Sequence, residues 1–354
     1  MSRKITSVLA LAVVALVAYL ALWPVPIEPV AWAAPTAPEL TGPYALNQDL
    51  ARGTRLLDGL GVGPEDVAFD AEGRIYTGFE DGRIFRMRPP DGEPELFAHT
   101  GGRPLGMVFD PLGYLVVADA VKGLLTVSPE GAVRVLATGV GTQPFGFLND
   151  LDIGPDGSIY VSDASTRFGY GSHQLPILEH GGDGQLLAWN PVTRSMSLLL
   201  DGLQFANGVV MEPSGESLLF AETGLYRISR YWLKGDRAGT VEVFADNLPG
   251  FPDNISRAED GRIWVPMSSP RHPLADALAA WPSLRKMLLR LPSALIPDAL
   301  RHGLVVELAP DGTPRRTLHD PSGSVAFVSC AMERDGVLYT GSFRDPSIVA
   351  VPLD

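Results

Sequence analysis

Residues 67–76 read Val67-Ala68-Phe69-Asp70-Ala71-Glu72-Gly73-Arg74-Ile75-Tyr76: an apolar run, a turn centred on Gly73, and a second run that ends in an aromatic residue. This pattern is typical of a β-hairpin. It recurs along the chain at residues 107–116, 151–160, 209–218, 255–264 and 330–338. Most copies are followed by another pair of short apolar runs, as at residues 82–87. Four strands per copy and six copies in roughly 300 residues predict an all-β fold, a six-bladed β-propeller.

The predicted propeller occupies residues 41–354. A propeller must close its ring, and the segment 46–57, just ahead of the first copy, is the natural candidate for the closing strand. The copies are unevenly spaced, which predicts insertions between the third and fourth copies and within the fifth.

Composition agrees with many short strands and excludes one class of partner. The 38 Gly and 31 Pro are scattered as turn residues between apolar runs. A formal net charge of -13 without a basic stripe argues against nucleic acid as a partner. The single cysteine, Cys330, excludes an intrachain disulfide and a zinc site built on thiolate pairs, and we expect it to be buried in a strand.

The N-terminus carries a candidate membrane anchor at residues 1–23. Arg3 and Lys4 precede an uncharged stretch from residue 5 to residue 23, close to the roughly 20 residues that cross a bilayer as a helix. With the two basic residues on the cytoplasmic side, the propeller would lie on the extracytoplasmic side, attached to the membrane through this N-terminal helix.

The alternative is a signal peptide that is cleaved after Ala31-Trp32-Ala33, which would release a secreted protein. Its apolar core would be longer than the usual one, so a retained anchor is the preferred interpretation. Residues 24–40 are rich in Pro and Ala and are expected to form a linker.

A ring of polar residues emerges when the copies are aligned on their turn glycines. The positions eight residues upstream hold Glu65, Leu105, Asn149, Asn207, Asp253 and Val328. The same register means the same place in every blade, here the start of the innermost strand, which faces the central channel. Four blades therefore direct an oxygen-bearing side chain at one axial point.

Two carboxylates and two amides, with no His or Cys among them, form a hard-oxygen set suited to Ca²⁺. Asn254, next to Asp253, could add a fifth oxygen. Taken one at a time, these residues have ordinary structural explanations: Asn207-Gly208 could be a hairpin turn, and Asn149-Asp150 a loop cap.

A second, deeper calcium could lie between Asp66 and Asp150, one residue further along the same strands, with a backbone carbonyl near Met107. The alternative is that backbone amides satisfy these two acids.

Several segments resemble known families. Those around the ring resemble the metal-binding segments of paraoxonases and, more loosely, gluconolactonases: Gly63-Pro64-Glu65-Asp66, Leu148-Asn149-Asp150, Phe205-Ala206-Asn207-Gly208 and Asp253-Asn254-Ile255-Ser256. The chain from residue 60 onward resembles more closely the strictosidine synthase-like family of six-bladed propellers, through Gly102-Arg103-Pro104-Leu105-Gly106, residues 118–124, residues 250–255 and Leu318-His319-Asp320-Pro321.

The resemblance implies an arylesterase-like or lactonase-like hydrolase, with catalytic calcium on Glu65, Asn149, Asn207, Asp253 and Asn254. Two departures matter. Paraoxonases carry a His where this chain has Leu105, and strictosidine synthase carries its catalytic Glu where this chain has Ser329, so the condensation reaction of the synthase is disfavoured.

The resulting hypothesis is a hydrolase of small-molecule esters or lactones with Asp253 and Asn207 as catalytic residues. Calcium would polarise the carbonyl, and Asp253 would orient or deprotonate the attacking water. His173 and His180, in the insertion after the third blade, are candidate bases. The rival hypothesis is a non-catalytic binding propeller in which the metal only rigidifies the ring.

Residues 274–301 interrupt the fifth copy with apolar residues at near-helical spacing. They could form a helical cap over the channel, a face that lies on a bilayer, or a helix packed on the side of the propeller.

Overall fold

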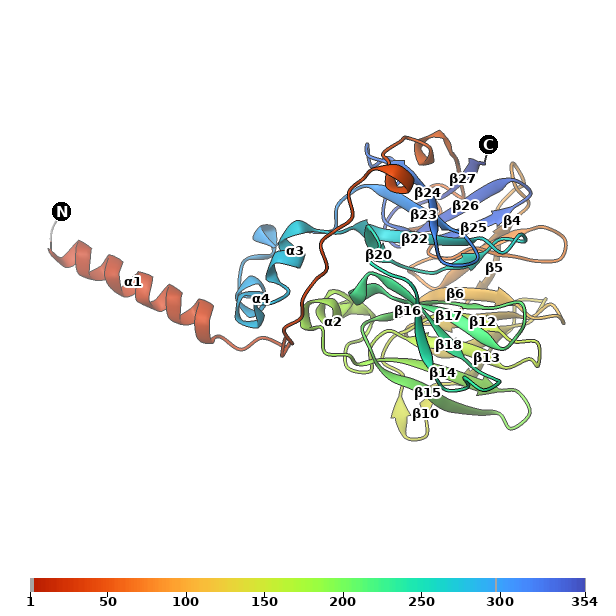
Figure 1. Cartoon of the computed structure of the whole chain (residues 1–354), viewed down its shortest axis with the longest axis horizontal. Coiled ribbons are helices and arrows are strands. Elements are labelled where there is room, and N and C mark those ends of the chain that lie inside the picture. The colour runs from red at the N-terminus through yellow and green to blue at the C-terminus, as the bar shows by residue number, and fades with distance from the viewer. Residues whose placement is uncertain (1–2, 297, 354) are drawn as a thin grey trace.

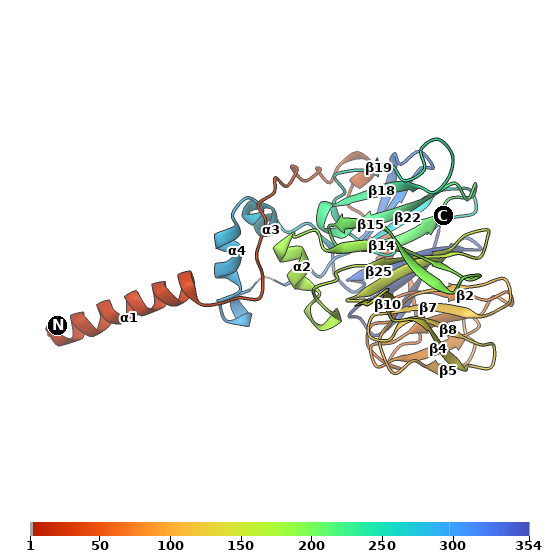
Figure 2. The same cartoon turned by 90° about the horizontal axis from the view of Figure 1, so that it is seen from below.

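Six antiparallel sheets, the blades, make up most of the chain. The computed structural model describes residues 3–296 and 298–353. Figure 1 shows the sheets gathered in one body, with the α-helices of the described residues on one side of it, and Figure 2 shows the same separation after a quarter turn. The predicted all-β, six-bladed propeller is confirmed.

Each blade runs from an inner strand outward. Blade 1 contains β2 (Ala68–Phe69), β3 (Ile75–Gly78), β4 (Arg83–Met87) and β5 (Glu95–His99). Blade 2 contains β6 (Pro104–Phe109), β7 (Leu115–Asp119), β8 (Gly123–Val127) and β9 (Val133–Ala137). Blade 3 contains β12 (Leu148–Ile153), β13 (Ile159–Asp163), β14 (Gly184–Asn190) and β15 (Ser195–Leu203). A small hairpin, β10 (Gly139–Val140) with β11 (Gln143–Pro144), separates blades 2 and 3.

Blade 4 contains β16 (Ala206–Met211), β17 (Ser217–Glu222), β18 (Arg227–Trp232) and β19 (Val241–Ala245). In blade 5 the inner strand is split into β20 (Gly250–Pro252) and β21 (Ser256–Arg257), followed by β22 (Ile263–Pro270), β23 (Gly303–Leu308) and β24 (Pro314–Asp320). Blade 6 contains β25 (Val328–Arg334), β26 (Val337–Ser342), β27 (Ile348–Pro352) and β1 (Thr54–Leu56).

Strand β1 closes the ring. It lies ahead of blade 1 in sequence but pairs with β27, with Thr54 opposite Ala350 and Leu56 opposite Ile348. The prediction that the segment 46–57 supplies the closing strand is confirmed.

The hydrophobic core lies between neighbouring blades, because each sheet is covered on both faces. Between blades 1 and 2, for example, Tyr76 and Ile84 pack against Leu115 and Val117. This explains why the strands contain nearly continuous apolar runs rather than strict alternation.

The pairing of the inner strand is interrupted at the same place in the blades. Its register shifts between Pro104 and Met107 in blade 2, and the same irregularity occurs between 148 and 151, 206 and 209, and 328 and 331. In blade 5 the interruption separates β20 from β21. Such bulges re-aim side chains next to functional sites. Asn149, Asn207 and, in blade 5, Asp253 lie at these interruptions, whereas Glu65 lies just ahead of β2.

The N-terminal segment contains α1 (Arg3–Leu22), which projects away from the propeller (Figure 1). Among the described residues, none of the helices combines the length and the apolar character needed to cross a membrane. The predicted membrane-spanning helix is therefore not supported.

Residues 24–36 do not form a free linker but a strap held against the domain. The carbonyl oxygens of Pro26, Val30 and Pro35 accept hydrogen bonds from Arg167, Arg285 and Arg271, respectively. The amides of Val30 and Trp32 donate to Glu179 O at 2.8 Å and Ala279 O at 3.2 Å. After the strap come two 3₁₀ turns, η1 (Gly42–Tyr44) and η2 (Leu50–Arg52).

Between β22 and β23, where the sequence placed a helical cap, the chain forms two short helices rather than one long one, α3 (Pro273–Leu278) and α4 (Pro282–Leu288), and then η5 (Ser293–Leu295). The insertion in blade 3 forms η3 (Tyr170–Ser172) and α2 (Gln174–Glu179), and η4 (Thr223–Leu225) follows β17 in blade 4. Helices α2, α3 and α4 lie on the same side of the propeller (Figures 1 and 2).

Candidate metal centre

The four predicted oxygen ligands are buried, in or just ahead of the inner strands of their blades. The exposed fraction is 4% for Glu65, 3% for Asn149, 2% for Asn207 and 6% for Asp253. Asn254 is also buried, at 3%. Burying polar side chains to this degree is costly unless each finds a partner.

Neither Asn149-Asp150 nor Asn207-Gly208 serves as a turn, because both pairs lie inside inner strands, β12 and β16. The glycine after Asn207 has a packing reason. A Cβ at Gly208 would lie 2.3 Å from the backbone nitrogen of Ile255, so only glycine lets blade 5 approach blade 4 this closely. The turn and loop-cap alternatives are therefore excluded.

In blade 6 the ring position belongs to Ser329 and not to Val328. Val328 pairs with Ser342, and the register shift comes directly after it. The hairpin of blade 6 turns over only Asp335 and Gly336, both with positive φ, so counting back from its glycine slips by one residue.

Hydrogen bonds join the ring residues of neighbouring blades. Ser329 Oγ donates to the carbonyl oxygen of Glu65 at 2.6 Å, and the amide of Asn254 donates to the carbonyl of Ser329 at 2.9 Å. Blades 5, 6 and 1 are thereby linked at the hub, and Glu65 and Asp253 come within electrostatic range of each other.

Thr223 orients the Asn207 amide. Asn207 Nδ2 donates to Thr223 Oγ1 at 3.2 Å, and Thr223 Oγ1 donates to the carbonyl of Pro252 at 2.6 Å. Because the Thr223 hydroxyl binds the amide nitrogen of Asn207, Asn207 Oδ1 is left for another partner.

No such partner is present among the described residues. Four buried side-chain oxygens of the predicted ligand set accept no hydrogen bond there: Glu65 Oε2, Asn149 Oδ1, Asn207 Oδ1 and Asn254 Oδ1. Buried polar atoms without a partner are rare in folded proteins, and a bound ion is one of the established explanations. These oxygens come from blades 1, 3, 4 and 5.

The electrostatics of the ring point the same way. Burial raises the pKa of Glu65 well above its usual range; the nearby Arg103 guanidinium opposes this rise, and Asp253 and Asp66 add to it. Burial also raises the pKa of Asp253 to about 7, against a hydrogen bond from Asn207 that lowers it. A divalent cation bound between these two buried carboxylates would offset their mutual repulsion.

The donor set suits calcium better than zinc, because it contains oxygen donors and neither His nor Cys. Within residues 3–296 and 298–353, no group of three or more His, Cys, Asp and Glu side chains is placed to hold a metal ion. The candidate set instead combines two carboxylates with three amides, the oxygen-only ligand type that calcium prefers. The residues therefore fit the ion that the sequence predicted.

The second predicted site has a different explanation. Asp66 Oδ2 accepts the amide of Met107 at 2.7 Å, and Asp150 Oδ2 accepts the amide of Val209 at 2.8 Å. Each carboxylate thus fastens its blade to the next one, which is the backbone-amide alternative. Both acids line a cavity of about 310 Å³ in the channel, and burial raises the pKa of Asp66 to about 7. A second calcium between them stays a prediction.

Comparisons with known proteins identify the family of the chain. A family model described as strictosidine synthase matches residues 149–236, and one described as strictosidine synthase-like, N-terminal, matches residues 42–87. Adipocyte plasma membrane-associated protein from Danio rerio is 38% identical over 352 residues, covering 93% of this chain and 84% of that protein. The chain belongs to the strictosidine synthase-like family.

Solved structures resemble this strictosidine synthase-like chain in fold. A gluconolactonase from Xanthomonas campestris is similar with a TM-score of 0.63 at 16% identity, over 93% of this chain and 99% of that one. Regucalcin from Agrobacterium tumefaciens, described as a calcium-binding protein, is similar with a TM-score of 0.59 at 16% identity, over 84% of this chain and 93% of that one.

One buried residue at the hub of the strictosidine synthase-like chain escaped the sequence analysis. Arg103, 1% exposed, donates from Nη1 to the carbonyl of Gly63 at 2.7 Å, and its guanidinium lies 5.5 Å from the ring centre of Tyr170. Its Nε and Nη2 have no partner among the described residues. The sequence feature that could have pointed to this residue is its position next to Pro104, directly before the apolar strand β6.

The two candidate histidines of the strictosidine synthase-like chain differ in position. His180 stacks on Trp32 with ring centres 4.2 Å apart, and burial lowers the pKa of His180 to about 4. His173 donates from Nδ1 to the carbonyl of Tyr170 at 3.3 Å and lines an apolar pocket, and burial lowers its pKa. His180 thus packs against the strap. Of the two histidines, only His173 lines the pocket.

Proposed function

We propose that this chain is a calcium-dependent hydrolase of carboxylic esters or lactones. The observation that carries the proposal is the set of unpaired buried oxygens on Glu65, Asn149, Asn207 and Asn254. Names among the structural relatives support it, since one is a gluconolactonase and another a calcium-binding protein. Because the fold alone does not fix a reaction, the proposal rests on the ring residues.

The ring residues have separate roles in this proposal. Glu65, Asn149, Asn207, Asp253 and Asn254 would hold the ion, which when bound supplies a Lewis acid for the carbonyl oxygen. Asp253 would orient the attacking water and take its proton, the role of a carboxylate general base. Thr223 would fix the amide of Asn207.

The test is hydrolysis of phenyl acetate and of δ-lactones with and without a chelator. We expect activity to disappear with the chelator and to return when calcium, but not magnesium, is added in excess. Magnesium should fail because it demands a small octahedral site, whereas this set of carboxylates and amides suits a larger ion. Activity that persists after exhaustive chelation contradicts the proposal. Loss of thermal stability on chelation, in a protein inactive under all conditions, favours the binding propeller.

We also propose that the chain associates with membranes, as the name of its Danio rerio relative suggests. Helix α1 carries large apolar side chains that are more than half exposed, among them Val8, Leu11 and Val14. We expect the full chain to float with phosphatidylcholine vesicles in a density gradient, and a chain with Val8, Leu11 and Val14 changed to Ser to remain at the bottom. Equal flotation of the two chains would contradict this role of α1.

A further inference from the structure

An apolar pocket of about 210 Å³ lies where the N-terminal strap meets the helical insertions. Its walls come from three segments that are far apart in sequence: Trp32 of the strap, Ile177 of α2, and the α3–α4 insertion with Ala275, Leu278 and Leu288. Neither the linker composition of residues 24–40 nor the apolar spacing of residues 274–301 predicted that these segments meet.

Three residues that line the pocket are close in sequence to the candidate metal ligands or to residues that bond near them. Gly224 follows Thr223, the partner of Asn207, and Phe251 precedes Asp253 by two residues. Phe343 follows Ser342, whose amide donates to the carbonyl of Pro64 at 2.9 Å. Blade 4 thus supplies the pocket with the residue after Thr223, blade 5 with a residue two positions before Asp253, and blade 6 with a residue whose neighbour bonds to Pro64, which precedes Glu65.

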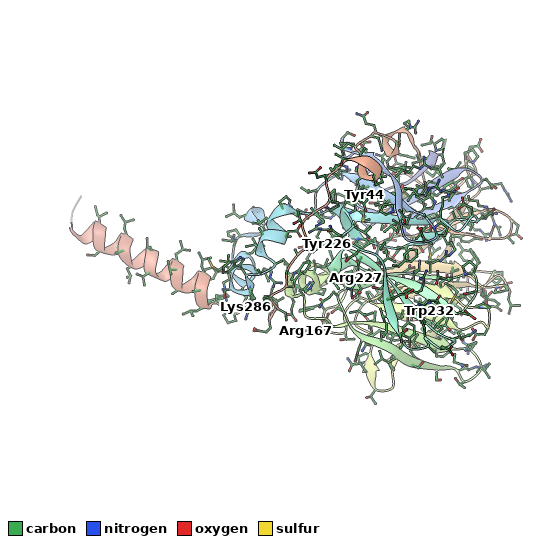
Figure 3. All side chains as sticks on the ribbon, viewed as in Figure 1. Tyr44, Arg167, Tyr226, Arg227, Trp232 and Lys286 are labelled. Atoms are coloured by element: carbon green, nitrogen blue, oxygen red, sulfur yellow. The ribbon has the colours of Figure 1, made fainter. Side chains whose placement is uncertain are left out.

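The strap wall is held in place before any ligand arrives. Arg285, 3% exposed, donates to the carbonyl of Leu178 at 2.7 Å, to that of Ala279 at 3.0 Å, and to that of Val30. It thus joins α2, the α3–α4 insertion and the strap. Trp32 is fixed by its stack on His180, and Lys286 and Arg167, labelled in Figure 3, bind the strap at Glu28 and Pro26.

Most polar side chains around the pocket are already engaged. Ser268 Oγ donates to the carbonyl of Phe251 at 3.2 Å, His272 Nδ1 accepts the amide of Leu274 at 3.1 Å, and Arg344 pairs with Asp298 at 2.8 Å. What remains for a ligand is mainly apolar surface, which would leave the hydroxyl groups of a sugar lactone without partners.

We propose that this pocket binds the apolar group of the substrate, an unbranched alkyl chain of medium length or an aromatic ring, beside the ring of metal ligands. The inference rests on the proposed function and gives it a substrate class. An apolar cavity of about 150 Å³ is known to take up benzene, so the volume here, about 210 Å³, exceeds that of a phenyl group.

The test compares two substitutions on the same helix. Ala275 of α3 lines the pocket, whereas Ala277, also on α3, is exposed and does not. Ala275→Trp fills the pocket, and Ala277→Trp adds the same side chain outside it. The probe is a series of non-hydrolysable alkyl ketones, from 2-hexanone to 2-dodecanone, titrated by calorimetry into the full chain.

We expect the affinity of the wild type to rise roughly fourfold per methylene until the pocket is full, from the transfer free energy of one CH₂. Ala277→Trp should behave like the wild type, and Ala275→Trp should lose at least tenfold for 2-decanone. A flat series in the wild type, or equal behaviour of the two variants, would overturn the proposal.

Hydrolysis separates this inference from the proposed function. With δ-decalactone and δ-valerolactone as substrates, Ala275→Trp should raise KM for the long-chain lactone and leave the short one unchanged. If the wild type hydrolyses no ester or lactone, the proposed function fails, and the ketone series still decides whether the pocket takes an alkyl chain. If it hydrolyses both lactones but Ala275→Trp treats them alike, the pocket assignment fails alone.

Discussion

The Asp253→Asn variant should lose ester and lactone hydrolysis by roughly a hundredfold to ten-thousandfold, the usual contribution of a general base. The change keeps the size of the side chain and removes the proton acceptor and one of the two ring carboxylates. A carboxylate can take up the proton of the attacking water, and an amide cannot. The measurement is kcat/KM for phenyl acetate at saturating calcium.

Asp152→Asn is the matched control. Asp152 is another channel carboxylate; burial raises its pKa to about 6, and its Oδ2 accepts the amide of Met211 at 2.7 Å. It does not belong to the ring, so its replacement should leave kcat/KM within about twofold, the scatter usual for substitutions away from the chemistry. Full activity of Asp253→Asn, or an equal loss in both variants, would remove Asp253 from the mechanism.

Asn149→Leu should change stability in opposite directions with and without calcium. Calcium at a hundredfold excess over its Kd stabilises the folded wild type by about 2.7 kcal/mol. For a chain of this size that corresponds to a rise in Tm on the order of 5 °C. Leucine removes the unpaired Oδ1 of Asn149, whose desolvation costs about 1–3 kcal/mol, so the calcium-free variant should unfold at a higher temperature than the calcium-free wild type. Its response to calcium should shrink or vanish.

Leu105→Ile serves as the control, since Leu105 holds the same register in blade 2 and offers no oxygen. It should keep the full calcium response.

The rise in Tm that calcium causes in the wild type should also depend on pH. The pKa of Asp253 lies above its unfolded value, so the folded calcium-free chain holds a proton that the unfolded chain has released, and stability falls as pH rises from about 4 to about 7. The Tm gain from calcium should therefore be larger at pH 8 than at pH 5.5. A lower calcium-free Tm for Asn149→Leu would contradict the unpaired-oxygen argument.

The sequence predicted what depends on local turns. Six hairpins follow from glycines such as Gly73, and with them the register that places Glu65, Asn149, Asn207 and Asp253 at one level. It missed the correct residue in blade 6, because the two-residue turn at Asp335 and Gly336 shortens that hairpin by one. Counting along a chain detects periodicity, but a bulge is defined by the partner strand.

Long-range contacts were beyond the same reasoning. Pro and Ala content predicted a linker, yet three arginines from distant segments, Arg167, Arg271 and Arg285, bind its carbonyls. The role of Arg103 likewise depends on blade 1, which supplies both Gly63 and Glu65. Local composition describes how a segment behaves alone and carries no information on what will cover it.

The pairing of β1 with β27 has a consequence for synthesis of the protein. Strand β1 leaves the ribosome long before its partner, so it stays without a sheet while five blades are translated. The ring can be sealed only after β27 has emerged, and an unsealed propeller exposes strand edges that invite misassembly. Ribosome-bound chains that end before residue 348 should therefore be sensitive to proteases in the first and last blades alike.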